Sequence, residues 1–352
     1  MIPAKAYAAY TSTEALRPYK FERRALRDND ILIDIEYCGI CHSDIHTVRG
    51  DWGPANYPVV PGHEIIGRVK ETGPKVTQFK TGQLVGVGCI VDSCQSCPSC
   101  NEGLEQYCEK GMTGTYNSRD KISGGFTQGG YSDKIVVQEK FVVSIPENID
   151  ARAAAPLLCA GITTWSPLKK WNVKAGDKVG ITGLGGLGHM GVKFAHALGA
   201  HVVMITTSRE KGEDARKLGA DEVLLSTDEN TMAQHSNSFD FLLNTIPVGH
   251  DANPYIKLLK RDATMVLVGA VEPMPPIHGG LLIGKRKNVA GSLIGGIRET
   301  QEMLDFCGEH NIVSDVEVIN IDYVNEAYER VLKADVKYRF VIDMKSLKAT
   351  AF

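Results

Sequence analysis

The sequence predicts an α/β protein in which a doubly wound parallel sheet follows a compact β-type domain. A length of 352 residues favours two domains over one. Mostly apolar runs alternate with helical segments after about residue 160, whereas shorter β-type runs separated by glycine turns precede it. We therefore expect a domain boundary near residue 159.

The first half contains short β-type runs bounded by glycine turns, as in VVPGHEIIGRVKETG and GGYSDKIVVQEKFVVSIPENI. Many short strands joined by such turns are typical of barrels and sandwiches. This half is therefore predicted to be barrel-like.

Composition narrows the function classes. Hydrophobic residues make up 43% and charged residues 23% of the chain, and no apolar run approaches the ~20 residues that cross a bilayer. The N-terminus does not resemble a secretory signal, so we expect a cytoplasmic protein with no membrane partner. A net charge of −3 gives no electrostatic reason to expect nucleic acid as a partner.

Residues 92–108, DSCQSCPSCNEGLEQYC, contain four of the nine cysteines. An odd total in a cytosolic chain fits disulfides poorly. Two overlapping C-x2-C steps supply three thiolates and the following loop returns a fourth, which predicts a closed, structural zinc site. The alternatives are a redox pair or a loop of free thiols. The predicted ligands are Cys94, Cys97, Cys100 and Cys108.

The stretch KAGDKVGITGLGGLGHMGVKFAHALGAHVVMITTS predicts a βαβ unit, with strands at 178–182 and 201–207 and a helix from about 186 to 198. The loop between them reads G-x-G-x-x-G, which lets backbone amides and a helix N-terminus approach a pyrophosphate. Further apolar runs predict the remaining strands of a Rossmann sheet, at 221–226, 238–246, 263–270 and 288–296. The predicted cofactor loop comprises Gly183, Gly185, Gly186, Leu187 and Gly188.

The end of the second strand of this unit favours NADP(H) over NAD(H). An acidic residue about twenty positions after the glycines normally binds the ribose of NAD, and this chain lacks one there. Thr207 and Ser208 leave room for a 2′-phosphate, and Arg209 and Lys211 supply positive charge. The alternative is that these two basic residues form a solvated helix start, and Glu210 weighs against phosphate binding.

Cys41, His63 and Cys159 are candidates for a second metal site, with three protein ligands and one open position. Spacing does not select them, because a lone cysteine or histidine in an apolar context more often serves packing. However, GICHSD at 39–44, GHE at 62–64, the four-cysteine loop and GLGGLG at 183–188 together resemble the zinc-dependent medium-chain alcohol dehydrogenases. The resemblance is narrower to their cinnamyl-alcohol-dehydrogenase-like branch and covers essentially the whole chain.

The resemblance implies a GroES-like catalytic domain at 1–159 and 298–352, and a Rossmann NADP-binding domain at 160–297. It implies that Cys41, His63 and Cys159 bind catalytic zinc, with Glu64 beside it. The implied reaction is NADP(H)-linked hydride transfer between primary alcohols and aldehydes, from a zinc-bound alkoxide. A homodimer paired near residues 288–296 is implied by the same analogy.

The resemblance also suggests a proton relay from Ser43 to His46, with Asp51 as an orienting partner. Asp44 is interpreted as a residue that holds a metal ligand in place. Ser292 lies where the family often contacts the nicotinamide end of the cofactor. Each of these roles competes with an ordinary structural one, such as a turn cap or an exposed loop residue.

The remaining cysteines, Cys38, Cys89 and Cys307, are predicted to be small buried hydrophobes. Two other functions compete with the dehydrogenase. One is a zinc-independent quinone or enoyl reductase of the same fold, and the other is a nucleic-acid-binding protein that uses the cysteine loop.

Overall fold

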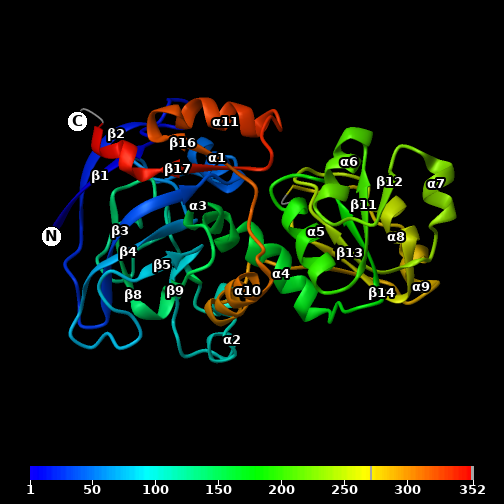
Figure 1. Cartoon of the computed structure of the whole chain (residues 1–352), viewed down its shortest axis with the longest axis horizontal. Helices are drawn as coiled ribbons and strands as arrows, with labels where there is room; N and C mark the ends of the chain where they lie inside the picture. The colour runs from blue at the N-terminus through cyan, green and yellow to red at the C-terminus, as the bar shows by residue number, and fades with distance from the viewer. Residues whose placement is uncertain (270–271, 350–352) are drawn as a thin grey trace. The chain divides into compact units, whose positions relative to one another are not determined.

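A computed structural model describes residues 1–269 and 272–349 (Figure 1). Contacts within the chain define two compact units, Met1–Cys159 with Gly295–Phe352, and Ala160–Ile294.

The second unit alternates strands and helices. Its described elements are α4 (Ala160–Lys170), β10 (Lys178–Thr182), α5 (Gly188–Ala197), β11 (His201–Thr206), α6 (Arg209–Lys217), β12 (Glu222–Leu225), α7 (Glu229–Gln234), β13 (Phe239–Asn244), α8 (Asn253–Leu258), β14 (Leu259–Leu267), α9 (Gly279–Ile283) and β15 (Asn288–Gly291).

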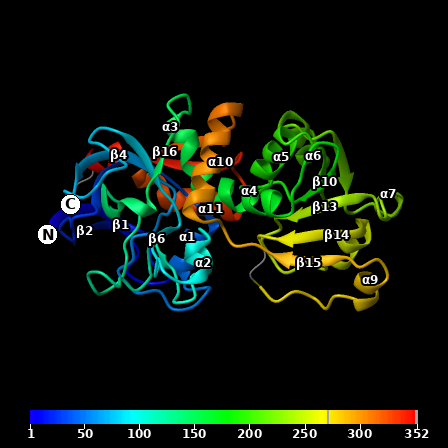
Figure 2. The ribbon, with the colours of Figure 1, turned by 90° about the horizontal axis from the view of Figure 1, so that it is seen from below.

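Across residues 160–269 and 272–294, six parallel strands form one sheet in the order β12-β11-β10-β13-β14-β15. Figure 2 shows β13, β14 and β15 side by side. The first strand in sequence, β10, lies inside the sheet, and the chain changes winding direction between β10 and β13. Ligands of doubly wound folds bind outside the carboxyl ends of the strands at such a point. The glycine loop follows β10 directly.

The strands of this sheet are apolar because both of its faces are covered. Val203, Phe239, Leu242 and Met265 belong to one fully buried cluster. The predicted helix begins two residues later than expected, at Gly188, because residues 183–187 form the loop itself. The strand predicted at 263–270 is observed as the end of β14, and residue 270 lies outside the described residues.

The first unit is built mainly from short strands. Its described elements are β1 (Ile2–Ala8), β2 (Arg17–Arg23), β3 (Asp30–Gly39), α1 (His42–Arg49), β4 (Ile65–Thr72), β5 (Leu84–Val87), β6 (Ile90–Asp92), α2 (Pro98–Asn101), η1 (Glu105–Tyr107), β7 (Thr113–Gly114), β8 (Lys134–Gln138), η2 (Glu139–Phe141), β9 (Val143–Ser144), α3 (Ala151–Ala154), η3 (Ala155–Leu158), α10 (Ile297–His310), β16 (Val316–Asn320), η4 (Ile321–Tyr323), α11 (Val324–Leu332), β17 (Arg339–Asp343) and η5 (Met344–Ala349).

Within the described part of this unit, seven strands form a sheet in the order β16-β17-β3-β4-β5-β9, with β8 also paired to β3. β3 pairs antiparallel with β17, so the end of the chain returns beside one of its first strands. This arrangement, together with the parallel sheet of the second unit, confirms the predicted fold class. The sheet places the end of β3 close to the starts of β17 and β4, where the site described below lies.

No helix in residues 1–269 and 272–349 combines the length and apolar character needed to cross a membrane.

Candidate metal centres and cofactor loop

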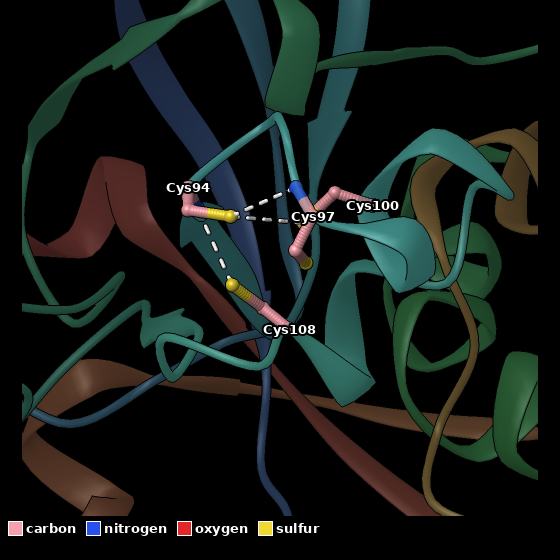
Figure 3. Close-up of side chains that lie close together, drawn as sticks. All are labelled: Cys94, Cys97, Cys100 and Cys108. Carbon is pink, nitrogen blue, oxygen red and sulfur yellow. Dashed lines mark hydrogen bonds between the residues drawn. The ribbon is translucent and has the colours of Figure 1, made fainter.

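The four cysteines of residues 94–108 come together in one cluster (Figure 3). Their sulfur atoms all lie within 4.8 Å of one another, and the Sγ atoms of Cys94 and Cys100 are 3.9 Å apart. Cys97 caps the short helix α2, and Cys108 follows the turn η1. Four convergent sulfurs are the donor set of a structural zinc site.

Backbone amides around this cluster point at sulfur. Cys97 N donates to Cys94 Sγ at 3.3 Å, and Cys94 N donates to Cys108 Sγ at 3.4 Å. Hydrogen bonds to the charged form lower a pKa. Bonds of this kind, led by that from the Ser96 backbone, lower the pKa of Cys94 to about 6. The loop therefore stabilises a thiolate, the form that binds metal.

A second cluster gathers Cys41, His63, Glu64 and Cys159, again with one donor atom of each within 4.8 Å of the others. The Sγ atoms of Cys41 and Cys159 are 3.9 Å apart. Cys41 follows β3, His63 and Glu64 precede β4, and Cys159 follows η3. The structure thus brings together three segments that are far apart in sequence.

Asp44 holds two of these segments. Its Oδ2 accepts a bond from Cys41 N at 2.9 Å at the start of α1, and its Oδ1 accepts from Gly62 N and from His63 Nδ1, both at 3.1 Å. With Nδ1 occupied, Nε2 of His63 is the nitrogen available to a metal.

Glu64 shows that this cluster suits a cation. The carboxylate is fully buried, and Oε1 accepts from Arg339 Nη2. Its Oε2 is buried without a hydrogen-bond partner among the described residues. Burial raises the pKa of Glu64 to about 7, even though Arg339 opposes the shift. A buried carboxylate with one unsatisfied oxygen, in a cluster with two sulfurs and an imidazole, fits a zinc ion at this point.

The pKa values of the two thiols in this cluster are shifted in opposite directions. A hydrogen bond from the Cys159 thiol is the main cause that lowers the pKa of Cys41 well below its usual value, and the same contact raises the pKa of Cys159. Cys89 also contacts Cys159. The prediction that Cys89 is a buried hydrophobe is wrong, because it is only partly buried and adjoins a candidate ligand. Cys38 and Cys307 are fully buried, as predicted.

The proposed relay residues lie on or just after α1. Cys41 Sγ is 3.5 Å from Ser43 Oγ, which brings the Ser43 hydroxyl beside the cluster. His46 Nδ1 lies 2.8 Å from Asp51 Oδ2, and the His46 ring stacks on Trp52 at 5.0 Å between centroids. With Nδ1 paired to Asp51, Nε2 is the His46 nitrogen that a proton relay would use.

The glycine loop has the geometry of a phosphate cradle. Gly183 has a φ of 86°, a conformation that favours glycine. A Cβ on Gly185 would meet nothing within 4 Å, so its backbone is open to a ligand. A Cβ on Gly188 would come closer than 3.0 Å to Gly183 O, so glycine is needed where α5 packs on the loop. Gly186 and Leu187 complete the turn into α5.

The end of β11 leads directly into α6. Ser208 caps this helix, with Oγ accepting from Lys211 N at 3.3 Å. Thr207, Arg209 and Lys211 are exposed. Ser292 follows β15, and its N donates to Leu267 O at 3.2 Å.

Comparison with known families matches the alcohol dehydrogenase GroES-like domain to residues 27–147 and the zinc-binding dehydrogenase family to residues 186–309. Aldehyde reductase YahK of Escherichia coli is 56% identical over 345 residues, covering 97% of this chain and 99% of that protein. The chain belongs to the zinc-dependent medium-chain alcohol dehydrogenases. NADP-dependent alcohol dehydrogenase C 1 of Mycolicibacterium smegmatis is 52% identical to this dehydrogenase, over 99% of this chain and the whole of that protein.

Solved structures place this dehydrogenase in the cinnamyl-alcohol-dehydrogenase-like branch. The cinnamyl alcohol dehydrogenase SbCAD4 of Sorghum bicolor superposes with a TM-score of 0.95 at 44% identity, covering 99% of this chain and 100% of that one. The Helicobacter pylori enzyme, solved in complex with NADP(H), gives a TM-score of 0.91 at 43% identity, with 98% and 99% covered.

Sequence reasoning missed two side chains of the catalytic cluster. Arg339 donates to Glu64 and to Ile40 O, the latter at 2.8 Å. Tyr116 lies with its ring centroid 5.7 Å from that of His63. Neither carries a local signal, because Tyr116 belongs to none of the motifs and Arg339 lies 275 positions after Glu64.

Proposed function

We propose that this dehydrogenase uses NADP(H) and zinc to interconvert primary alcohols and aldehydes by hydride transfer. The convergence of Cys41, His63 and Cys159 carries the proposal, because three protein ligands with one open position are the arrangement of catalytic zinc sites. Relatives named aldehyde reductase and NADP-dependent alcohol dehydrogenase support the reaction. Relatives named mannitol and cinnamyl alcohol dehydrogenase support a broad range of aliphatic and aromatic substrates.

Cys41, His63 and Cys159 would hold the catalytic zinc, with Glu64 beside it, and the four-cysteine loop a structural zinc. When bound at the three-ligand site, zinc supplies Lewis-acid polarisation of the substrate oxygen. Asp44 keeps His63 oriented for this task.

The protein's own groups handle the proton. As the Ser43 hydroxyl, beside Cys41 Sγ, accepts the proton of the alcohol, it gives up its own proton in the direction of His46. Asp51 accepts a hydrogen bond from Nδ1 of His46, which leaves Nε2 to take up the proton. Because the His46 side chain is 28% exposed, Nε2 can pass this proton to solvent.

Residues 160–297 would bind NADP(H), and residues 1–159 with 298–352 would form the catalytic domain. The open backbone at Gly185 supports binding of the pyrophosphate. The exposed Thr207, Arg209 and Lys211, together with the partly buried Ser208, support binding of a 2′-phosphate. Ser292 would contact the nicotinamide end.

We also propose a cytoplasmic homodimer. β15 is the last strand of its sheet, and an edge strand offers unpaired backbone groups to a second copy.

The decisive experiment screens NADPH and NADH against aldehydes, together with a zinc count. We expect about two zinc ions per chain, one for each cluster, and a strong preference for NADPH. Cys159→Ala should abolish turnover, whereas Cys307→Ala, which removes a buried cysteine that no cluster uses, should not. Full activity of Cys159→Ala would favour the zinc-independent reductase instead.

A further inference from the structure

Asp44 is a fully buried carboxylate that receives a fourth donor in addition to those from Cys41, Gly62 and His63. The hydroxyl of Tyr131 donates to its Oδ2 at 3.2 Å. Tyr131 is itself fully buried. It is therefore joined to the candidate ligand His63 through one carboxylate.

Tyr131 has its own partner. The hydroxyl of Tyr328, on α11, donates to the hydroxyl of Tyr131 at 3.5 Å, and the ring centroids lie 6.4 Å apart. A hydroxyl that accepts one bond donates the next more strongly. Four side chains thus form a series from α11 to the metal cluster, in the order Tyr328, Tyr131, Asp44 and His63.

The backbone keeps Tyr131 in this position. Its N donates to Pro61 O at 3.0 Å. Its ring packs on Gly62, where a Cβ would come within 2.6 Å of Tyr131 Cδ1. Burial, reinforced by the charge of Asp44, raises the pKa of Tyr131 well above its usual value. The hydroxyl therefore keeps its proton and remains a donor to Asp44.

We propose that Tyr131 is a positioning residue for the catalytic zinc, and that Tyr328 acts through it. The Tyr131 hydroxyl fixes the rotation of the Asp44 carboxylate, and Asp44 fixes the His63 ring. Without this donor, Oδ2 keeps only the bond from Cys41 N, and the carboxylate is held less firmly. The inference rests on the proposed zinc site at Cys41, His63 and Cys159.

The test compares Tyr131→Phe, Tyr328→Phe and the double variant with the wild type. Tyr10→Phe is the matched control, because it also removes a tyrosine hydroxyl bond in this unit, to Pro18 O at 3.3 Å. Zinc release is titrated with a competing chelator. The step that is absent in Cys159→Ala is assigned to the zinc at Cys41, His63 and Cys159, and the affinity is taken from that step. Partners of metal ligands typically change affinity by about 10- to 100-fold.

Tyr131 is separated from the ligand His63 by Asp44, so its effect should be smaller than that of a direct partner. We expect Tyr131→Phe to lose roughly 3- to 10-fold in zinc affinity. Tyr328→Phe should lose less, and the double variant should match Tyr131→Phe alone. The visible absorption bands of cobalt at the same site should shift in Tyr131→Phe and not in Tyr10→Phe.

Equal zinc affinity and equal cobalt spectra in Tyr131→Phe and Tyr10→Phe would overturn the inference and leave the proposed function intact. Additive losses in the double variant would overturn the role assigned to Tyr328. If the wild type and Cys159→Ala release zinc in the same steps, both the inference and the proposed zinc site are overturned.

Discussion

Two glycines of the cofactor loop should respond differently to the same substitution. In Gly185→Ala the new methyl meets nothing within 4 Å, so the fold should keep its stability. In Gly188→Ala the methyl comes closer than 3.0 Å to the backbone oxygen of Gly183, which also accepts a bond from Thr245 Oγ1 at 2.9 Å. Because the clash is with backbone, which cannot rotate away, α5 must move, at a cost of about 1–3 kcal/mol.

The effect of these substitutions on cofactor binding depends on how closely the cofactor pyrophosphate approaches Gly185. If the pyrophosphate lies against Gly185 as proposed, a methyl there would occupy its space and weaken the amide bonds to it. Hydrogen bonds to charged groups are each worth about 1.5–3 kcal/mol, so loss of one lowers NADPH affinity by roughly 10- to 100-fold. Gly188→Ala should lose both affinity and stability, and Gly185→Ala affinity alone.

The assay measures NADPH affinity by fluorescence titration and stability by thermal unfolding. Gly279→Ala is the control, since it lies in the same unit and its methyl also meets nothing within 4 Å. Unchanged NADPH affinity in Gly185→Ala, at unchanged stability, would refute the assignment of this loop to the pyrophosphate.

Arg209→Ala should weaken NADPH roughly tenfold and leave NADH unchanged if Arg209 binds the 2′-phosphate, whereas equal effects on both cofactors would favour a solvated helix start. Asp30 is fully buried and accepts from Arg24 and Arg27; these bonds outweigh burial and lower its pKa. Because the folded-state pKa lies below the usual 3.8, this stabilisation is complete above that pH and is lost as pH falls through the folded-state pKa. Asp30→Asn should cost roughly 2 kcal/mol near neutral pH in urea unfolding and less in acid. Finally, rising urea should release zinc from the cluster of Cys41, His63 and Cys159 before the four-cysteine loop loses its zinc.

The parts of the molecule that could be predicted are those written locally in the sequence. The cysteine loop and the glycine loop each lie within seventeen residues or fewer, so turn chemistry and ligand spacing define them. The parallel strands were also predictable, because strands covered on both faces form continuous apolar runs. The exact start of α5 could not be predicted, because the same run of glycines forms both the loop and the first turn of the helix.

The catalytic cluster lies beyond such local rules. Cys41 and Cys159 are 118 positions apart, and Arg339 reaches Glu64 across 275. Family resemblance selected the three ligands, because their motifs recur together. It did not select Tyr131, Tyr328 or Cys89, whose roles depend on tertiary contacts that no spacing encodes.

The two clusters should therefore differ in how they lose metal. Cys94 and Cys108 are only 14 positions apart, so their loop can stay closed when the surrounding sheet loosens. The other cluster closes a far longer segment and depends on β3, β4 and the residues after η3 keeping their places. The entropy gained on opening grows with loop length, though slowly, and the sheet contacts that hold this cluster are lost as the unit unfolds. In rising urea, loss of turnover should accompany release of one zinc per chain, while the second stays bound until the unit unfolds further. Simultaneous release of both would show that the cysteine loop has no stability of its own.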